Sequence, residues 1–563
     1  MSDPKTLSNL KVNLFQNIAL TISGGGYRAS AFGLGVLSYL NHTPFQEKPL
    51  LESVKGLSTV SGGTLTGATY ALYMAKGNKF PDFYKDFYHI LDEDIILKTA
   101  FDKFSADEVW KTSHKRRSLI NAFALAYEEI LTNGAFREIK NGDKSHLEDI
   151  CFNATDLSFG LAFRFQTTGD FGNYRLKNRI LDPLIGEIKI ADAIAASSCF
   201  PLGFEPIVFP DDFFSHSSSL YTNLKMEPNF IHGVGLMDGG IVDNQGIGSI
   251  MKADARRKKS RKTFDLIMVC DVGSYFMDPW KASSNADVFQ NKPISLKKIF
   301  TRTRKSINQL KLLYVTLFIG LIILITGFQT IQSKWAWIAI GAVGFAWLCS
   351  TLIMIFSRKL KQVIIENLLR IGKMVPGFLK PKLTIFYDLQ LSLMKIMLEE
   401  RYTSAVTMIN DIFLKQIRRL NYDLFYKDEN LQNRRITSLI YQLTKEQFLK
   451  GESDEIRKEE KEDFIENPGE KIFSSAKIAR EMGTTLWFTE KDKEVSRLKN
   501  LVSCGQFTSC YNLLKYCIEL KKSGSAVDNA LLDQMIGVFH SDWIKFINDP
   551  FWLHDETKIS QGT

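Results

Sequence analysis

The sequence lacks the features that mark secreted, disulfide-stabilised and zinc-binding proteins. Its seven cysteines are odd in number and include no Cys-x-x-Cys pair, so the spacing predicts neither a disulfide framework nor a zinc site. A reducing compartment is the simpler interpretation. Residues 1–10 are polar and lack the apolar stretch of a secretory signal. We therefore expect the main folded part to lie in the cytosol.

The sequence also lacks a large excess of charge of either sign. The net charge of +9 is modest for 563 residues, and basic residues gather near 252–262 and 297–311 instead of spreading evenly. No recognised nucleic-acid-reading module accompanies them, so we expect no nucleic-acid partner. Such clusters fit an anionic membrane surface or ordinary solvation better. An apolar share of 45% and an aromatic share of 12% indicate a folded chain, and the length allows roughly two to four domains.

Two long segments contain no formal charge at all. They are Leu312–Ser333 and Trp335–Ser357, separated by Lys334. Each is long enough to cross a bilayer as a helix, so residues 307–360 are predicted to form a transmembrane hairpin. A pair of buried helices in a large soluble core is the alternative. Lysines and arginines flank the hairpin on both outer sides, which predicts that both large parts of the chain lie on the cytoplasmic side.

The region before the hairpin alternates short apolar runs with amphipathic segments, which is typical of an α/β protein with a mainly parallel sheet. We expect an α/β/α domain over residues 1–290 and a mainly helical region over 361–563, which could complete that domain. The predicted strands are Ile18–Ile22, Gly56–Val60, Gly160–Gln166 and Leu266–Asp271, and the predicted helices include Ser30–Asn41 and Gly63–Tyr73. Thr484–Thr489 is a further strand candidate, and Ser453–Glu466 is predicted to be a solvated charged segment.

A serine between small residues follows the second predicted strand. The segment Thr59-Val60-Ser61-Gly62-Gly63 fits a sharp turn that lifts a serine from the end of a strand to the start of a helix. Gly63 would allow the backbone to pass close to the reacting centre. Ser61 is therefore the first candidate nucleophile.

A glycine-rich loop follows the first predicted strand. Gly24, Gly25 and Gly26 precede Tyr27 and Arg28, and their amides can point at the negative oxygen of a tetrahedral intermediate. The alternatives are a flexible loop or a phosphate-binding loop. The segment lacks the Lys-Ser/Thr pair that ends a P-loop motif and the glycine spacing of a dinucleotide-binding motif. Arg28 either orients this loop and adds positive potential or is a solvated side chain.

A serine needs a base, and the eight histidines stand in no context that marks one as its partner. The better candidate is Asp238, which ends an apolar run and is followed by Gly239 and Gly240. These glycines permit a tight turn and a close backbone approach. A dry pocket would raise the proton affinity of such a carboxylate. An ordinary turn is the alternative for this segment taken alone.

Together these motifs resemble the patatin-like phospholipase family. That family has a Gly-Gly-Gly-x-Arg/Lys loop, a Gly-x-Ser-x-Gly elbow and an Asp-Gly-Gly/Ala segment in this order. Residues 153–156 and 193–201 are similar to further family blocks, and the resemblance spans about Ile18 to Gly246. Thr59 departs from it, because the family has glycine there. The resemblance implies a Ser61–Asp238 dyad, an acyl-enzyme, no metal and hydrolysis of lipid acyl esters. We expect no cofactor, and a membrane phospholipid as the substrate.

Other functions remain open from the sequence alone. An acyltransferase or a neutral-lipid lipase could use the same serine, since an acyl-enzyme can be discharged to an alcohol instead of water. A membrane scaffold that retains the fold without turnover is a third possibility. A regulated effector, restrained by the helical region after Gln362, is a fourth.

Overall fold

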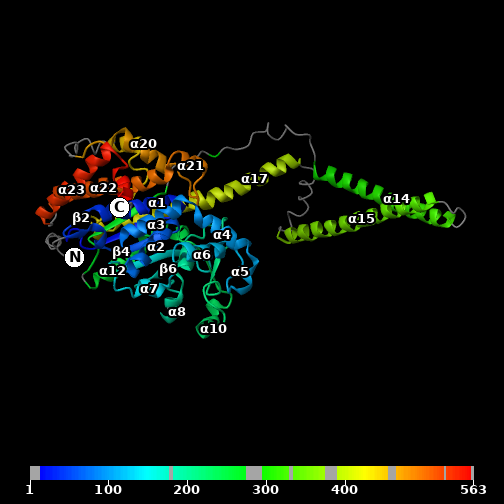
Figure 1. Ribbon diagram of the computed structural model, residues 1–563, viewed down its shortest axis with the longest axis horizontal. Helices are drawn as coiled ribbons and strands as arrows, with labels where there is room; N and C mark the ends of the chain where they lie inside the picture. Colours follow the sequence, from blue (N-terminus) through cyan, green and yellow to red (C-terminus); the bar gives the residue numbers. More distant parts are fainter. Residues whose placement is uncertain are drawn as a thin grey trace. The chain divides into compact units, whose positions relative to one another are not determined.

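The computed structural model describes residues 13–176, 182–260, 262–273, 280, 295–328, 334–374, 390–453, 465–524 and 528–559. The chain divides into two compact units (Figure 1). Unit 1 combines Met1–Met277 with Met408–Thr563, and unit 2 is Asp278–Thr407. The segment with both charge-free spans is therefore inserted, along the chain, between two stretches of one compact unit.

Unit 1 is built on a mixed, mainly parallel sheet with the strand order β10-β9-β1-β4-β5-β8-β7, and β6 pairs with β5. The first five strands in this order run parallel to their neighbours, whereas β6 and β8 are antiparallel to β5, and β7 is antiparallel to β8. This confirms the predicted α/β class. The bounds are β1 Ile18–Ile22, β4 Val54–Val60, β5 Asp149–Asp156, β6 Leu161–Gln166, β7 Ile207–Phe209, β8 Val234–Asp238, β9 Leu266–Asp271 and β10 Arg435–Leu439; β2 (Pro44–Phe45) and β3 (Lys48–Pro49) form a separate pair.

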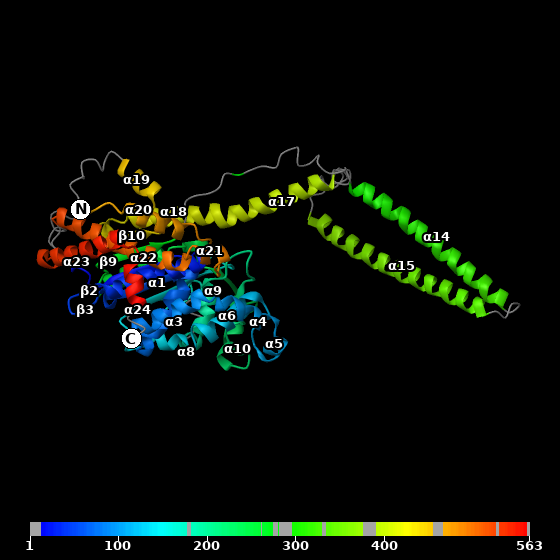
Figure 2. The same ribbon diagram turned by 45° about the horizontal axis from the view of Figure 1, so that its top comes forward.

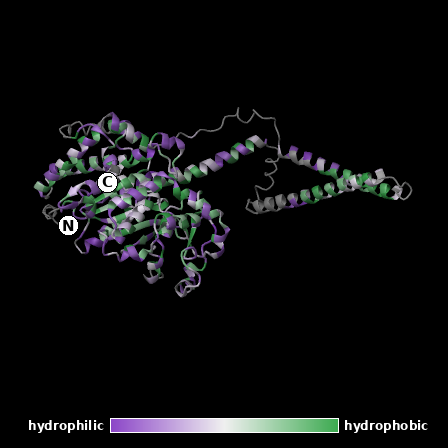
Figure 3. Ribbon diagram, in the orientation of Figure 1, coloured by the Kyte–Doolittle hydropathy of each residue, from purple (hydrophilic) through white to green (hydrophobic). Residues whose placement is uncertain are grey.

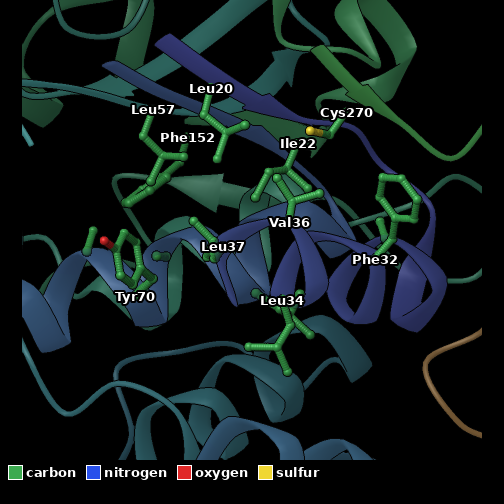
Figure 4. Close-up of a cluster of buried hydrophobic side chains, with 14 of the residues drawn as sticks. Leu20, Ile22, Phe32, Leu34, Val36, Leu37, Leu57, Tyr70, Phe152 and Cys270 are labelled. Carbon is green, nitrogen blue, oxygen red and sulfur yellow. The ribbon is translucent and has the colours of Figure 1, made fainter. Parts of the chain in front are cut away.

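Alternate residues of the central strands face two different cores. On β1, Leu20 and Ile22 belong to the larger core, whereas Ala19 belongs to the smaller one. Figure 4 shows the larger core, in which Leu20 and Ile22 lie over side chains of α1 (Gly26–His42). The smaller core joins the other face to α12 (Ile247–Lys258) and α18 (Leu414–Lys427). The period of two along buried strands thus gives three layers, with helices on both faces.

The other helices complete these layers. Helix α22 (Arg497–Lys522) packs along α1 in both views (Figures 1 and 2). The remaining helices of unit 1 are α2 Gly62–Lys76, α3 Phe80–Asp92, α4 Ile95–Ser105, α5 Asp107–Thr112, α6 Leu119–Ile130, α7 Phe136–Lys140, α8 Asp182–Glu187, α9 Ile190–Ser197, α10 Ser219–Lys225, α11 Gly240–Asp243, α19 Lys445–Ser453, α20 Gly469–Arg480, α21 Glu490–Glu494, α23 Asn529–Asn548 and α24 Trp552–Ile559; short turns are η2 Leu50–Ser53, η3 Pro228–Phe230, the π-helix η5 Met408–Phe413 and η6 Glu429–Leu431.

Unit 2 contains α14 (Leu296–Phe328), α15 (Lys334–Met374) and α17 (Leu391–Thr407). Helices α14 and α15 pack together, and the rings of Tyr314 and Trp347 stack with centroids 5.4 Å apart. Two stretches, Arg304–Gly327 and Trp337–Lys359, are long and apolar enough to cross a membrane, with a mean hydropathy of 2.2 each. Only 0% and 6% of these windows is buried, unlike the core helix of a soluble protein. In Figure 3 the apolar colouring is concentrated toward the C-terminal end of α14 and in the N-terminal half of α15.

One strand prediction is wrong and two segments fall partly outside the described residues. Thr484–Thr489 forms a loop instead of a strand, and the strand that returns to the sheet after the insertion is β10, which pairs with β9. The loop packs on α1, where the amide of Tyr27 donates to the carbonyl of Thr485 at 2.8 Å. Most of the charged segment Ser453–Glu466 and residues 329–333 of the first charge-free span lie outside the described residues.

Candidate active site

Ser61 stands at a sharp turn between β4 and α2. Its φ of 51° and ψ of −123° are unusual for a residue with a side chain, and strained backbone of this kind concentrates at functional sites. The Ser61 amide donates to Oγ of Ser197 at 2.9 Å, which holds the turn in place. The strand-turn-helix context that the sequence predicted for Ser61 is therefore present.

Hydroxyl groups support the turn from behind. Oγ1 of Thr59 donates to Oγ1 of Thr64 at 3.0 Å, and Thr64 and Ser197 share a hydrogen bond of 2.8 Å. Oγ of Ser197 donates to the carbonyl of Asn153 at 2.6 Å. Thr59, which departs from the usual glycine, is thus part of a chain of side-chain hydrogen bonds that ends at the amide of Ser61.

Asp238 ends β8, and its carboxyl group lies beside Ser61. Oδ1 accepts the amide of Gly240 at 2.7 Å, and Asp238 and Ser61 line the same cavity. Burial raises the pKa of Asp238 to about 6, because desolvation outweighs the effects of the nearby Ser61 side chain and of the Gly240 amide, which favour the charged form. The structure therefore brings together the two side chains that the sequence paired.

Glycines allow the backbone to close around these residues. The amide of Gly239 donates to the carbonyl of Ser197 at 3.3 Å, and a Cβ on Gly239 would collide with the carbonyl of Asn153. A Cβ on Gly63 would lie 2.5 Å from the carbonyl oxygen of Ile22. Gly63 therefore lets α2 pass directly over the end of β1.

The glycine loop lies against Ser61. A Cβ on Gly24 would be 3.1 Å from Cβ of Ser61, and Gly26 has a left-handed φ of 58°. The amide of Gly24 donates to the carbonyl of Asn244 at 3.0 Å, so it is already paired. Gly25 and Gly26 stand at the start of α1, where a helix has no acceptor of its own for their amides. The amide of Gly62 has the same position at the start of α2.

Arg28 is buried beneath this loop, contrary to the alternative of a solvated side chain. Its exposed fraction is 7%, and Nη1 donates to the carbonyl of Met482 at 2.8 Å. Burial lowers the pKa of Arg28 to about 10, and nearby Asp271 partly offsets that effect. Nε is buried and has no partner within the described part of the chain.

Ser61, Asp238 and the glycine loop open into one cavity of about 530 Å³. This volume lies in the range of small-molecule binding sites. Among the described residues that line it there is no histidine; the lining consists of Gly24, Gly25, Gly26, Arg28, Ser61, Ser198, Phe200, Pro201, Asp238, Gly240, Ile241, Asn244, Gly273, Asp411, Leu414, Lys415, Arg418, Gly483, Thr484 and Leu486. All of these lining residues belong to unit 1.

Comparison with protein families gives one match to this region. Residues 20–250 match the family model described as patatin-like phospholipase. This region is a patatin-like phospholipase domain. A comparison with curated proteins gives no match. The family supports a lipid acyl hydrolase in general, and the patatin-like domain contains the glycine loop, Ser61 and Asp238.

Several residues at the patatin-like site were missed by the sequence analysis. Ser197 lies in segment 193–201, which the sequence analysis compared with a family block without giving Ser197 a role, and no motif marked Asn244. Both contact the site through hydrogen bonds. Lys415 and Arg418 come from α18, beyond the matched range and after the inserted unit. Only the basic run of α18 could have drawn attention to them, and such runs usually form solvated helix faces.

Proposed function

We propose that the chain is a membrane-anchored lipid acyl hydrolase that cleaves acyl esters of membrane phospholipids with Ser61 as the nucleophile and Asp238 as its base. The observation that carries the proposal is that Ser61 and Asp238 line one cavity, close enough for the Ser61 side chain to affect the pKa of Asp238, which burial raises. A carboxyl group that titrates at about 6 is a stronger base than an ordinary aspartate and is still ionised at neutral pH.

In the first half of the reaction, Oγ of Ser61 attacks the ester carbonyl carbon while Asp238 accepts its proton. The carbonyl oxygen becomes negative and accepts hydrogen bonds from the amides of Gly25, Gly26 and Gly62. The loop glycine Gly24 positions these donors, because its own amide is paired with Asn244. One such donor contributes about 2.7 to 4 kcal/mol of transition-state stabilisation.

The tetrahedral intermediate then collapses to an acyl-enzyme. The bond between the carbonyl carbon and the lipid alkoxide breaks, and Asp238 returns its proton to the alkoxide, which leaves as an alcohol. In the second half, Asp238 removes a proton from water, and the hydroxide attacks the acyl carbon. Collapse of this second intermediate releases a fatty acid, and the proton goes back to Oγ of Ser61. No metal is needed for either half.

Lipid analysis by mass spectrometry tests the chemistry. Phospholipid vesicles are incubated with the wild-type protein, Ser61→Ala and Asp238→Asn, and the fatty acids and lysolipids are quantified. We expect release by the wild type alone. Equal release by Ser61→Ala would refute the proposal. If an added alcohol became acylated and no free fatty acid was released, the enzyme would be an acyltransferase instead of a hydrolase.

The membrane part of the proposal is supported by α14 and α15, whose apolar windows are almost wholly exposed. Basic residues lie before the first span and after the second, which favours a hairpin with both ends on the cytoplasmic side. Anchoring would keep the site close to its lipid substrate and raise its effective concentration.

Alkaline carbonate extraction of membranes that contain the full chain tests the anchoring. We expect the protein to stay in the pellet. Ile323→Arg combined with Ile353→Arg places a charge in each span, at a cost of roughly 2.5 to 3.5 kcal/mol each, and should shift the protein to the supernatant. Met226→Arg, at an exposed apolar residue of unit 1, is the matched control. Extraction of the wild type and the control alike would refute the anchoring.

A further inference from the structure

Helix α18 brings two cationic side chains to the wall of the active-site cavity. Lys415 and Arg418 both line it, together with Leu414. These residues follow the inserted unit in the chain and lie outside residues 20–250, which carry the family motifs. The two cations therefore lie outside the three segments that carry the family motifs, although they line the same cavity.

Arg418 is held rigidly where it meets the cavity. Its exposed fraction is 9%, and Nε donates to Oδ2 of Asp271 at 2.7 Å. The same carboxylate accepts the hydroxyl of Tyr422 at 2.8 Å and the amide of Gly273 at 2.7 Å. A guanidinium that is fixed on one edge keeps its remaining N–H groups pre-oriented for an anion, so little entropy is lost on binding.

Lys415 lies one turn before Arg418, and its side chain is 15% exposed. Its Nζ forms an ion pair with Oδ1 of Asp411 at 3.7 Å, and the side chain of Asp411 is 47% exposed.

Three cations and two carboxylates line the cavity. The cations are Arg28, Lys415 and Arg418, and the carboxylates are Asp411 and the reacting Asp238. Asp271, which is not on the lining, pairs with Arg418. Nε of Arg28 is buried without a partner among the described residues. A buried polar group of this kind is costly unless a ligand satisfies it.

We propose that Lys415 and Arg418 bind the phosphodiester of the lipid substrate and so make the site select phospholipids over neutral acylglycerols. The inference rests on the proposed function, since it names the substrate class of the same site. A phosphodiester carries a single negative charge and would lie beside these two cations on the cavity lining. Its oxygens accept hydrogen bonds from ammonium and guanidinium groups in the geometry that these side chains favour.

Lys415→Gln tests the proposal, because glutamine keeps a polar side chain but removes the charge. Dioleoyl phosphatidylcholine and dioleoylglycerol are compared in the same mixed micelles, so the ester and the acyl chains are identical. We expect kcat/KM for the phospholipid to fall about tenfold and kcat/KM for dioleoylglycerol to change less than about twofold. An equal change for both substrates, or no change for either, would overturn the proposal.

Lys427→Gln is the matched control. Lys427 lies on the same helix and pairs with Asp423 four residues earlier at 3.5 Å, as Lys415 does with Asp411, but it is not part of the cavity lining. Both substrates should be cleaved as by the wild type. A loss equal to that of Lys415→Gln would overturn the proposal, because it would reflect the charge of α18 in general.

Arg418→Lys is the second variant, since lysine keeps a positive charge beside Asp271 and spares the fold. We expect a fall in kcat/KM for the phospholipid that exceeds the fall for dioleoylglycerol by about fivefold or more. Thermal unfolding of the variant monitors the structural role of the Asp271 pair. Equal falls for both substrates would assign Arg418 to structure alone and overturn its part of the proposal.

A lipid-binding measurement and a phosphate-inhibition measurement distinguish the remaining explanations. If the wild type cleaves neither ester, the proposed function fails, and binding of dihexanoyl phosphatidylcholine decides the inference. Ser61→Ala should then bind this lipid about tenfold more tightly than Ser61→Ala with Lys415→Gln, and equal binding would overturn the inference. Inhibition by millimolar inorganic phosphate that disappears in Lys415→Gln, with an unchanged lipid preference, would also overturn it and leave free phosphate as the ligand.

Discussion

The methyl group of Thr59 occupies space that Gly67 leaves open on the facing helix. A Cβ built on Gly67 would collide with Cγ2 of Thr59. Thr59 stands where the family has glycine, two residues before Ser61. The structure accommodates the larger side chain because Gly67 of α2 has no side chain. The Thr59 hydroxyl also donates a hydrogen bond to Oγ1 of Thr64, next to the turn that carries Ser61.

Gly67→Ala should therefore destabilise the protein. Overpacking of a close helix-strand contact costs about 1 to 3 kcal/mol, measured as a loss in the free energy of unfolding in urea. Thr59→Ser removes Cγ2 but retains the hydroxyl, so the double variant should recover most of that stability. Strictly additive effects of the two substitutions would show that the contact does not exist.

Gly26→Ala should abolish most of the activity. Gly26 has a φ of 58°, and a Cβ there would collide with the carbonyl of Thr485, so the loop that presents the Gly25 and Gly26 amides must shift. We expect kcat to fall by about 10² to 10³. Gly160→Ala is the control, because Gly160 has a similar φ of 64° but nothing within 4 Å of the added Cβ. A comparable loss of activity in both variants would contradict this explanation.

The rate of ester hydrolysis should rise with pH through about 6 and then level off. Asp238 must be ionised to accept the proton of Ser61, and burial raises its pKa from 3.8 to about 6. Below that value each pH unit should lower kcat/KM about tenfold. Stopped assays with a soluble short-chain ester between pH 4 and 8 measure the profile. A rate that is constant across this range would exclude Asp238 as the base.

Asp238→Asn should stabilise the folded protein while it removes activity. A carboxyl group with a raised folded pKa favours folding only when protonated, so its contribution is lost as the pH rises from about 3.8 through about 6. The shift corresponds to about 3 kcal/mol, and asparagine can still accept the amide of Gly240. We expect a gain of about 1 to 3 kcal/mol at pH 7.5 that disappears near pH 4. An equal gain at both pH values would point to another cause.

Much of the central sheet could be predicted from the sequence, because buried parallel strands are short apolar runs. The predictions for Ile18–Ile22 and Leu266–Asp271 match β1 and β9 at both ends. Strand β10 was missed, since Arg435–Leu439 is polar, half-buried and at the sheet edge. The loop at Thr484–Thr489 was mistaken for a strand because its aromatic residues pack on α1, where the rings of Phe488 and Tyr27 lie 5.6 Å apart.

The site was predictable only where backbone geometry demands a particular residue type. Glycines beside Ser61 and Asp238 leave a local pattern, and the structure places these segments together. The pairing of the Gly24 amide with Asn244 and the approach of Arg418 to the cavity depend on tertiary contacts between distant segments. Neither has a periodicity or spacing that a single sequence can reveal.

Covalent labelling of the full-length protein with a fluorophosphonate, followed by peptide mass mapping, tests the central role of Ser61 most directly. The account predicts one dominant adduct, on Ser61, which is absent in Ser61→Ala and forms at least about a hundredfold more slowly in Asp238→Asn. An adduct on another serine that survives in Ser61→Ala, with undiminished ester hydrolysis, would contradict it.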